Sequence, residues 1–139
     1  MDTRDEAKKY LDELRLYWAK SFFGMLEKSL KGTGFVLAYL ESAQGEVCAG
    51  DVARELHVST ARIAALQKAM EKNGLITRSP SQEDARKTVI RITEKGVREL
   101  QQRRERMLDK AVTVLERVGR DDAEEFIRIS GKIKRALEE

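Results

Sequence analysis

Apolar side chains in the first part of the chain recur with a helical period. Between residues 5 and 30 they are three or four positions apart, which is the spacing of one face of an α-helix. These positions are Leu11, Leu14, Trp18, Phe22 and Met25. The spacing predicts one long helix over 5–30, then a short helix over 35–43 and a short extended segment over 46–48.

The last part of the chain repeats this helical pattern twice. Apolar side chains recur at the same spacing over 97–118 and over 126–137, which predicts two more helices. Thr93 and Asp121 precede these helices and are their expected caps, because a short polar side chain can accept a hydrogen bond from an unpaired backbone N–H. The apolar faces exceed what one small core needs, which favours a helical interface between two chains. The alternative is that they pack within one chain.

The middle of the chain combines helical and strand patterns. Residues 49–56 and 60–73 each have the spacing of a short helix, with Ser59 as the expected cap of the second one. Residues 75–78 and 88–92 are rich in β-branched side chains, which predicts two strands joined by a polar turn that contains the only proline. Helix, turn, capped helix and hairpin in this order predict a winged helix–turn–helix. The expected fold class is therefore mainly α with a small β-hairpin wing.

Composition excludes several classes of protein. A chain of 139 residues is expected to form one domain, and its single cysteine cannot form a disulfide within the chain. One histidine and one cysteine cannot supply the usual ligands of a zinc site, so no metal is expected. No apolar run reaches the roughly 18 residues of a membrane span, and the charged N-terminus does not resemble a secretory signal. The sequence has no glycine-rich phosphate loop and no nucleophile paired with histidine, so it predicts neither an enzyme nor a cofactor.

The net charge of +3 is concentrated in the middle of the chain. Residues 54–91 contain eight basic and four acidic side chains, a local excess of four positive charges. Such a basic bias over a helix–turn–helix and its wing is typical of DNA binding, whereas the alternative is an ordinary solvated surface with unevenly placed charges. With Ile63, Leu66 and Met70 turned toward the core, the helix over 60–73 could enter a major groove about 12 Å wide.

The chain from Gly50 to Gly96 resembles the DNA-binding region of the MarR (multiple antibiotic resistance regulator) family. Four short stretches carry the resemblance, in the family's order and spacing: residues 50–56, Val58-Ser59, residues 71–78, and the Asp84-x-Arg86 pair followed by residues 92–96. The architecture of one long helix before this region and two after it is also similar. The resemblance implies a bacterial transcriptional regulator, most often a repressor, that is located in the cytoplasm with the nucleoid and reads a pseudo-palindromic operator of double-stranded DNA as a homodimer.

The resemblance also implies how the chain is organised. We expect 1–139 to form a single domain in which 31–99 are the winged helix–turn–helix lobe, while 1–30 and 100–139 are the helical dimerisation region. A two-fold dimer would place two recognition helices about one turn of DNA apart.

The resemblance and the outward basic residues together identify candidate DNA contacts. In the family the arginine of the Asp-x-Arg pair enters the minor groove, so Arg86 is the first candidate, and Asp84 is expected to hold the shape of the wing by pairing with a nearby basic residue. On the recognition helix, Arg62 is the candidate for reading bases and Lys68 for the DNA backbone. The two other basic candidates lie on the hairpin and are expected to contact phosphates. The full set of DNA-binding candidates is Ser59, Thr60, Arg62, Lys68, Arg78, Arg86 and Lys87.

The chain departs from the family on its recognition helix, where Ala64 and Ala65 replace residues that are often polar or basic. Fewer side chains are then available to read bases. We expect specificity to depend more on thymine methyl groups, on DNA shape and on the wing.

Many family members bind a small aromatic or phenolic effector between the dimer helices and the DNA-binding lobe. The residues that could line such a pocket here are Trp18, Phe22, Phe35, Tyr39, Arg104 and Met107. Arg104 interrupts an apolar stripe and could meet a ligand carboxylate, but it could equally pair with a glutamate across the interface. The alternative for the whole set is ordinary core packing.

Cys48 lies where the family commonly has a threonine or serine helix cap. A thiol at a helix N-terminus can have a lowered pKa, so a thiol-based redox-responsive regulator is one alternative function, and an inert cysteine is the other interpretation. Peroxide-sensing family members usually carry their cysteine near the start of the first long helix, where this chain has none. A second alternative is a winged-helix module that binds protein, against which the outward Arg62 and Lys68 and the basic wing argue.

Overall fold

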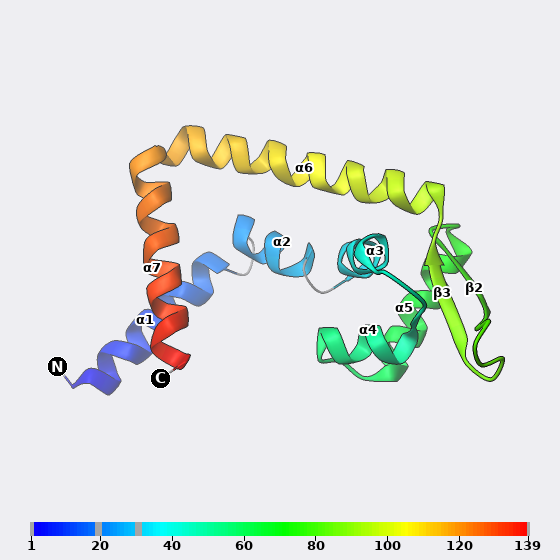
Figure 1. Ribbon diagram of the computed structural model, residues 1–139. Helices are drawn as coiled ribbons and strands as arrows, with labels where there is room; N and C mark the ends of the chain where they lie inside the picture. Colours follow the sequence, from blue (N-terminus) through cyan, green and yellow to red (C-terminus); the bar gives the residue numbers. More distant parts are fainter. Residues whose placement is uncertain (1, 19–20, 30–31, 139) are drawn as a thin grey trace. The chain divides into compact units, whose positions relative to one another are not determined.

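The computed structural model describes residues 2–18, 21–29 and 32–138. The elements in chain order are α1 (Thr3–Trp18), α2 (Phe22–Ser29), α3 (Thr33–Ser42), β1 (Val47–Cys48), α4 (Ala49–Leu56), α5 (Thr60–Lys72), β2 (Ile76–Pro80), β3 (Thr88–Ile92), α6 (Glu94–Val118) and α7 (Arg120–Glu138) (Figure 1). The chain divides into two compact units, Met1–Arg104 and Glu105–Glu139, and the boundary falls within α6. Among the described residues, none of the helices combines the length and the apolar character that a membrane crossing requires.

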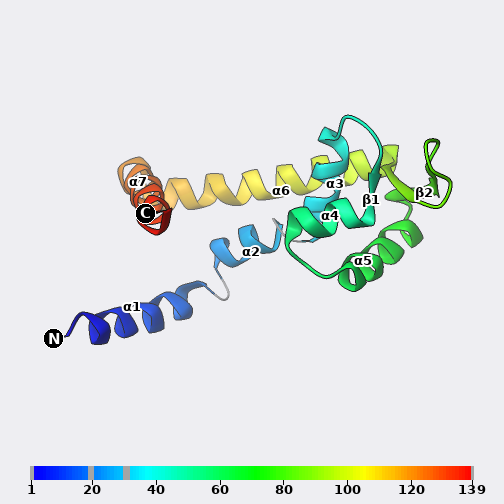
Figure 2. The same cartoon turned by 60° about the horizontal axis from the view of Figure 1, so that its bottom comes forward.

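One apolar core joins α3, α4, α5, the sheet and the start of α6. The helices lie close to the strands in both views of the chain (Figures 1 and 2). The core residues are buried because the apolar positions of each short helix recur on one face. They are Val36, Leu37, Leu40, Val47, Val52, Ala53, Ile63, Met70, Leu75, Ile76, Ile90 and Leu100. Burying a large apolar side chain contributes roughly 1.5–3 kcal/mol, so this core is what holds α5 and the hairpin in place.

The sheet has three antiparallel strands in the order β1-β3-β2. The hairpin pairs Ile76 with Ile92 at its base and Pro80 with Thr88 at its far end. Strand β2 lies at the edge of the sheet, where a proline is tolerated because its missing N–H faces away from the neighbouring strand. The predicted strand over 88–92 is confirmed, whereas the first strand lies slightly later than the predicted 75–78.

Most of the predicted helix ends are confirmed. Ser59 Oγ accepts the backbone N–H of Arg62 at 3.2 Å and begins α5, and Thr93 Oγ1 accepts the N–H of Gly96 at 3.0 Å at the start of α6. Gly74 follows α5 with φ +74°, a left-handed conformation that glycine adopts without strain. Gly96 is also required for packing, because a Cβ at this position would overlap the carbonyl oxygen of Leu75.

Two predictions about helices are wrong. The region 5–30 contains two helices instead of one, since α1 ends at Trp18 and α2 begins at Phe22. Between them, Ser21 donates its hydroxyl to the carbonyl of Trp18 at 3.0 Å, a local bond that competes with the helical pattern.

The other correction concerns the cap of the last helix. Helix α7 begins at Arg120, so Asp121 lies in its first turn and is not the cap. Gly119 takes a left-handed conformation with φ +93° after α6, and its carbonyl accepts the N–H of Ala123 at 3.1 Å to begin α7. The Asp121 carboxylate still lies near the positive end of the helix dipole.

The first and last helices bury no residue within the chain. Neither α1 nor α7 contains a buried residue among those described, although both have an apolar face. The exposed large apolar side chains on α1, α6 and α7 are Tyr10, Leu11, Leu14, Leu16, Tyr17, Trp18, Leu108, Val112, Leu115, Val118, Phe126, Ile127, Ile129, Ile133 and Leu137. Amphipathic helices of this kind usually bury their apolar face, whereas these side chains are exposed in each of the two compact units.

Candidate nucleic-acid interface

Helix α5 presents one face to the core and the opposite face to solvent. Ile63 and Met70 are buried as predicted and Leu66 is half-buried, while Gln67, which the pattern did not assign to the core, is also buried. The outward residues are Thr60, Ala61, Arg62, Ala64, Ala65, Lys68, Ala69 and Lys72. The exposed surface of α5 therefore consists mainly of alanine methyl groups, with Arg62, Lys68 and Lys72 beside them.

Arg62 and Lys68 carry unpaired charges on this surface. Both side chains are exposed, and neither forms an ion pair with any residue that the structure describes. Ser59 and Thr60 are exposed at the N-terminus of the same helix, where backbone N–H groups and the helix dipole attract anions. The structure thus brings these four predicted residues onto one helix and its cap.

Arg86 is held by its own neighbour in the wing. The Asp84 carboxylate accepts the Arg86 backbone N–H at 3.1 Å, its Nε at 3.1 Å and its Nη2 at 3.3 Å. These hydrogen bonds, led by those of the Arg86 side chain, lower the pKa of Asp84 below its ordinary value. The Arg86 side chain nevertheless remains 91% exposed. The basic partner of Asp84 in this structure is therefore Arg86, the residue predicted to enter the minor groove.

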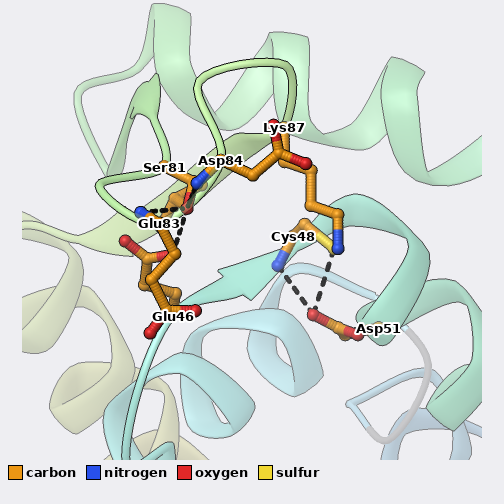
Figure 3. Close-up of a pocket in the computed structure, with 8 residues that line it drawn as sticks. Glu46, Cys48, Asp51, Ser81, Glu83, Asp84 and Lys87 are labelled. Carbon is orange, nitrogen blue, oxygen red and sulfur yellow. Dashed lines mark hydrogen bonds between the residues drawn. The ribbon is translucent and has the colours of Figure 1, made fainter.

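The turn of the wing is anchored to the loop that precedes β1. Glu46 Oε1 accepts the backbone N–H of Gln82 at 3.0 Å, and its Oε2 accepts the hydroxyl of Ser81. Ser81 Oγ in turn accepts the N–H groups of Glu83 at 3.1 Å and Asp84 at 3.2 Å (Figure 3). The hydrogen bond from Ser81, followed by that from Gln82, lowers the pKa of Glu46 below its ordinary value. Sequence analysis missed Glu46 and Ser81, because no local spacing relates two residues 35 positions apart.

Lys87 extends from the wing toward the N-terminus of α4. A cavity of about 180 Å³ lies there, lined by Glu46, Cys48, Asp51, Ser81, Glu83, Asp84, Lys87 and Val89. Figure 3 shows the Lys87 side chain reaching toward Cys48 and Asp51. Its charge contributes to the lowered pKa of both Asp51 and Asp84, after the hydrogen bonds that each carboxylate accepts. No cluster of possible metal ligands occurs in the described parts of the chain.

Arg78 joins the hairpin to α5. Its Nε and Nη2 donate to the two carboxylate oxygens of Glu71 at 2.9 and 3.0 Å. The Arg78 side chain lowers the pKa of Glu71 through these bonds. Two of the three guanidinium nitrogens therefore donate to α5, although the side chain remains partly exposed.

Cys48 occupies the predicted position at the start of α4. The Asp51 carboxylate accepts the backbone N–H of Cys48 at 2.9 Å and its thiol at 3.1 Å. These two bonds, the backbone one first, lower the pKa of Asp51. Cys48 thus acts together with Asp51 at this helix end, and a redox role for its thiol remains an alternative prediction.

The residues predicted for an effector pocket are only partly brought together. Phe35 and Tyr39 stack on α3 with ring centroids 6.1 Å apart, and Trp18 stacks instead on Phe23 at 5.2 Å. Arg104 Nη1 donates to Glu41 at 3.0 Å, which joins α6 to α3 within the chain. Two candidates remain: the side chain of Phe22 lies outside the described residues, and Met107 belongs to the second compact unit.

Comparison with known proteins relates the central part of the chain to one family. A sequence model described as MarR family matches residues 35–88, which contain α4, α5 and most of the hairpin. None of the curated proteins matches the sequence significantly.

Solved structures share the fold over most or all of the chain. A MarR family protein from Bacillus stearothermophilus has a TM-score of 0.69 at 22% identity and covers 100% of this chain and 99% of its own. The YusO protein from Bacillus subtilis has a TM-score of 0.72 at 17% identity, and the match covers 98% of this chain and 99% of YusO. The crystal structure of a Staphylococcus aureus MepR–DNA complex has a TM-score of 0.57 at 18% identity, and the match covers 76% of this chain and 74% of MepR. Residues 35–88 are therefore similar to the MarR family, within a chain whose winged-helix fold is that of solved MarR family proteins.

Proposed function

We propose that this chain is a sequence-specific DNA-binding transcriptional regulator, acting as a repressor and as a homodimer on a pseudo-palindromic operator. The observation that carries the proposal is the surface of α5 and the wing, where Arg62, Lys68 and Arg86 are exposed. In the proposed complex α5 lies in the major groove and Arg86 enters the neighbouring minor groove. The MepR–DNA complex supports this use of the fold, since that protein was solved with DNA.

The exposed residues of α5 have separate proposed roles. Arg62 reads a guanine through its two-pronged guanidinium, and Lys68 contacts a phosphate. Ser59 and Thr60, at the start of α5, contact the DNA backbone. Arg78 and Lys87 are proposed phosphate contacts. On binding DNA, Arg78 would leave Glu71, and Lys87 would leave the carboxylates of Asp51 and Asp84, to contact a phosphate instead. The alanine surface leaves much of the remaining specificity to thymine methyl groups and to DNA shape.

The proposed dimer and its regulation rest on the helices outside this lobe. The exposed apolar faces of α1, α6 and α7 support a dimerisation region formed by 1–30 and 100–139, with 31–99 as the DNA-binding lobe. A small aromatic or phenolic effector, bound among the pocket candidates, would release the repressor by favouring a dimer geometry that does not fit the operator. Such a regulator would work in the cytoplasm, on the nucleoid.

Binding selection from random-sequence DNA tests the proposal and yields the operator. We expect the selected duplexes to share a two-fold symmetric site, and their affinity to fall steeply with salt because phosphate contacts release counterions. Arg86→Ala should lower affinity for the selected duplex by about tenfold or more in a gel-shift titration, since a charge-assisted contact is lost.

Arg120→Ala provides the matched control, because it removes the same charge from α7 and should leave affinity nearly unchanged. Absent or salt-independent binding would contradict the proposal and would favour a winged-helix module that binds protein. An unchanged affinity of the Arg86→Ala variant would remove the wing arginine from the mechanism.

A further inference from the structure

We propose that Glu46 is a positioning residue for the wing, which holds the turn in the conformation that presents Arg86 to DNA. The inference rests on the proposed function, because it takes Arg86 to be a DNA contact. Glu46 lies outside the hairpin, in the loop between α3 and β1, and it makes no proposed contact with DNA itself.

The first step of the argument is the pair of bonds that Glu46 accepts. One carboxylate oxygen receives the backbone N–H of Gln82 and the other receives the hydroxyl of Ser81. Arg91 adds a weaker charge interaction, with its Nη2 3.8 Å from Oε1. Both oxygens are therefore used by the wing, and the Glu46 side chain is only 28% exposed.

The second step is the hydroxyl of Ser81, which has one donor and two acceptor positions. Its proton is directed to Glu46, which leaves its lone pairs for the N–H groups of Glu83 and Asp84. Ser81 is 7% exposed, so water cannot easily replace these partners. Because Glu46 accepts the hydroxyl proton of Ser81, both lone pairs of Ser81 Oγ are available for the two N–H groups that close the turn.

The third step leads from this turn to Arg86. The N–H of Ser81 donates to the carbonyl of Lys87 at 2.9 Å, and the N–H of Lys87 donates to the carbonyl of Asp84 at 2.9 Å. Asp84, fixed by these bonds, orients Arg86 through three further ones. Without the anchor at Glu46, the turn would have to be ordered during binding, and that entropic cost would weaken the complex.

Electrostatics alone predicts the opposite effect, which makes the inference easy to test. A carboxylate near a surface that binds a polyanion repels it, so removing the charge should strengthen binding. The lowered pKa of Glu46 means that its carboxylate is ionised at neutral pH. A loss of affinity on removing Glu46 would therefore have to come from the lost position of the wing.

The experiment compares three variants on the duplex selected from random-sequence DNA. Glu46→Ala should weaken binding by about three- to tenfold, and Glu46→Gln by less, because an amide oxygen can still accept one of the two bonds. Glu83→Ala is the matched control, since it also removes a carboxylate that lines this cavity. The Glu83 carboxylate forms no ion pair with any of the described residues. This control should bind as well as the unaltered protein or slightly better.

A double-mutant cycle with Arg86→Ala separates positioning from general destabilisation. If Glu46 acts through Arg86, adding Glu46→Ala to the Arg86→Ala variant should change affinity by less than about twofold. A merely structural role would weaken binding by the same factor in both backgrounds. Circular dichroism melting of each variant shows whether the lobe is still folded at the assay temperature.

The outcomes distinguish this inference from the proposed function. If the unaltered protein selects no duplex, the proposed function itself fails. If it binds but Glu46→Ala binds equally well or better, or if the losses in the cycle add, the positioning role is overturned while DNA binding stands. A loss that disappears in the Arg86→Ala background supports the inference.

Discussion

Gln67 is a buried amide on the inner face of α5. It is 4% exposed and lies between Ile63 and Met70 in the helical period. Its Nε2 has no hydrogen-bond partner among the residues that the structure describes. An amide group buried in this way costs about 1–3 kcal/mol of stability, because the bonds to water that it loses on folding are not replaced.

Replacing Gln67 should therefore stabilise the protein. Gln67→Met has a similar length and no buried polar group, and we expect it to raise the free energy of unfolding by about 1–2 kcal/mol. Urea denaturation at a fixed protein concentration measures the change as a higher midpoint with an unchanged slope.

The matched control is Gln101→Met, which makes the same substitution at an exposed position of α6. It should change stability by less than about 0.5 kcal/mol. A Gln67→Met variant that is less stable than the original protein would mean that the amide is satisfied in solution.

At the scale of an element, the N-terminus of α4 joins the helix–turn–helix to the sheet. Strand β1 pairs with β3 through Val47 and Cys48, and α4 begins directly after it. Asp51 accepts two bonds from Cys48, so its charged form is stabilised in the folded state. Cys48 and Asp51 form a capping box, in which the Asp51 carboxylate three residues into the helix accepts the backbone N–H of the cap.

The lowered pKa of Asp51 predicts how stability depends on pH. Its contribution is present above its ordinary pKa of 3.8 and is lost as the pH falls through the lower folded-state value. Asp51→Asn should cost about 1 kcal/mol at pH 7, as the loss of a helix cap does, and the difference from the original protein should shrink below pH 4. Urea denaturation at pH 7 and pH 3 measures both values.

Cys48→Ser is the corresponding control, because it keeps the backbone N–H and replaces the thiol by a hydroxyl donor. It should preserve both the stability and its pH dependence. If the Asp51→Asn difference stays constant down to pH 3, the two bonds seen at this helix end do not stabilise the charged carboxylate in solution.

At the scale of the whole molecule, many large apolar side chains of the terminal helices are exposed. The stripe on α7 consists of Phe126, Ile129, Ile133 and Leu137, and all four are exposed. Burying such side chains between two copies is the simplest way to remove them from water, with each buried side chain contributing roughly 1.5–3 kcal/mol.

We therefore expect the protein to have twice the mass of its 15.9 kDa chain in solution. Ile133→Glu places a charge on a side chain that is 60% exposed in the single chain. If this face is covered by a second copy, the variant should dissociate toward monomers, because an unpaired buried charge is strongly unfavourable. Light scattering over a range of concentrations measures the mass.

The neighbouring Lys132→Glu variant is the control, since it introduces the same residue at an exposed polar position of α7. It should leave the mass unchanged. A monomeric original protein, or an Ile133→Glu variant that stays dimeric, would show that α7 does not form the interface.

Features that depend on neighbouring residues were predictable from the sequence. The caps Ser59 and Thr93 and the left-handed Gly74 act within a few positions of themselves, so their residue types and spacing indicate them. The boundaries of α4, the strand β3 and the outward cations of α5 follow from the same local patterns. Gly119 is a visible break in the helical pattern, but Asp121 was misassigned as the cap from its residue type, because α7 already begins at Arg120.

Contacts between distant segments could not be predicted in this way. Glu46 meets Ser81 across 35 positions, and Arg104 meets Glu41 across 63. Gln67 was not expected in the core because its amide is polar, yet the position of α5 against the sheet turns it inward.

The sequence by itself determined the winged-helix pattern and its basic surface, because helix periods, caps and hairpins depend on residues that are close along the chain. Only the tertiary structure decided how the wing is anchored and which carboxylates pair with Arg78, Arg86 and Arg104. It also decided that the Gln67 amide is buried without a hydrogen-bond partner for Nε2 among the described residues. These features depend on three-dimensional proximity, which the packing of the core creates between segments that no local spacing relates.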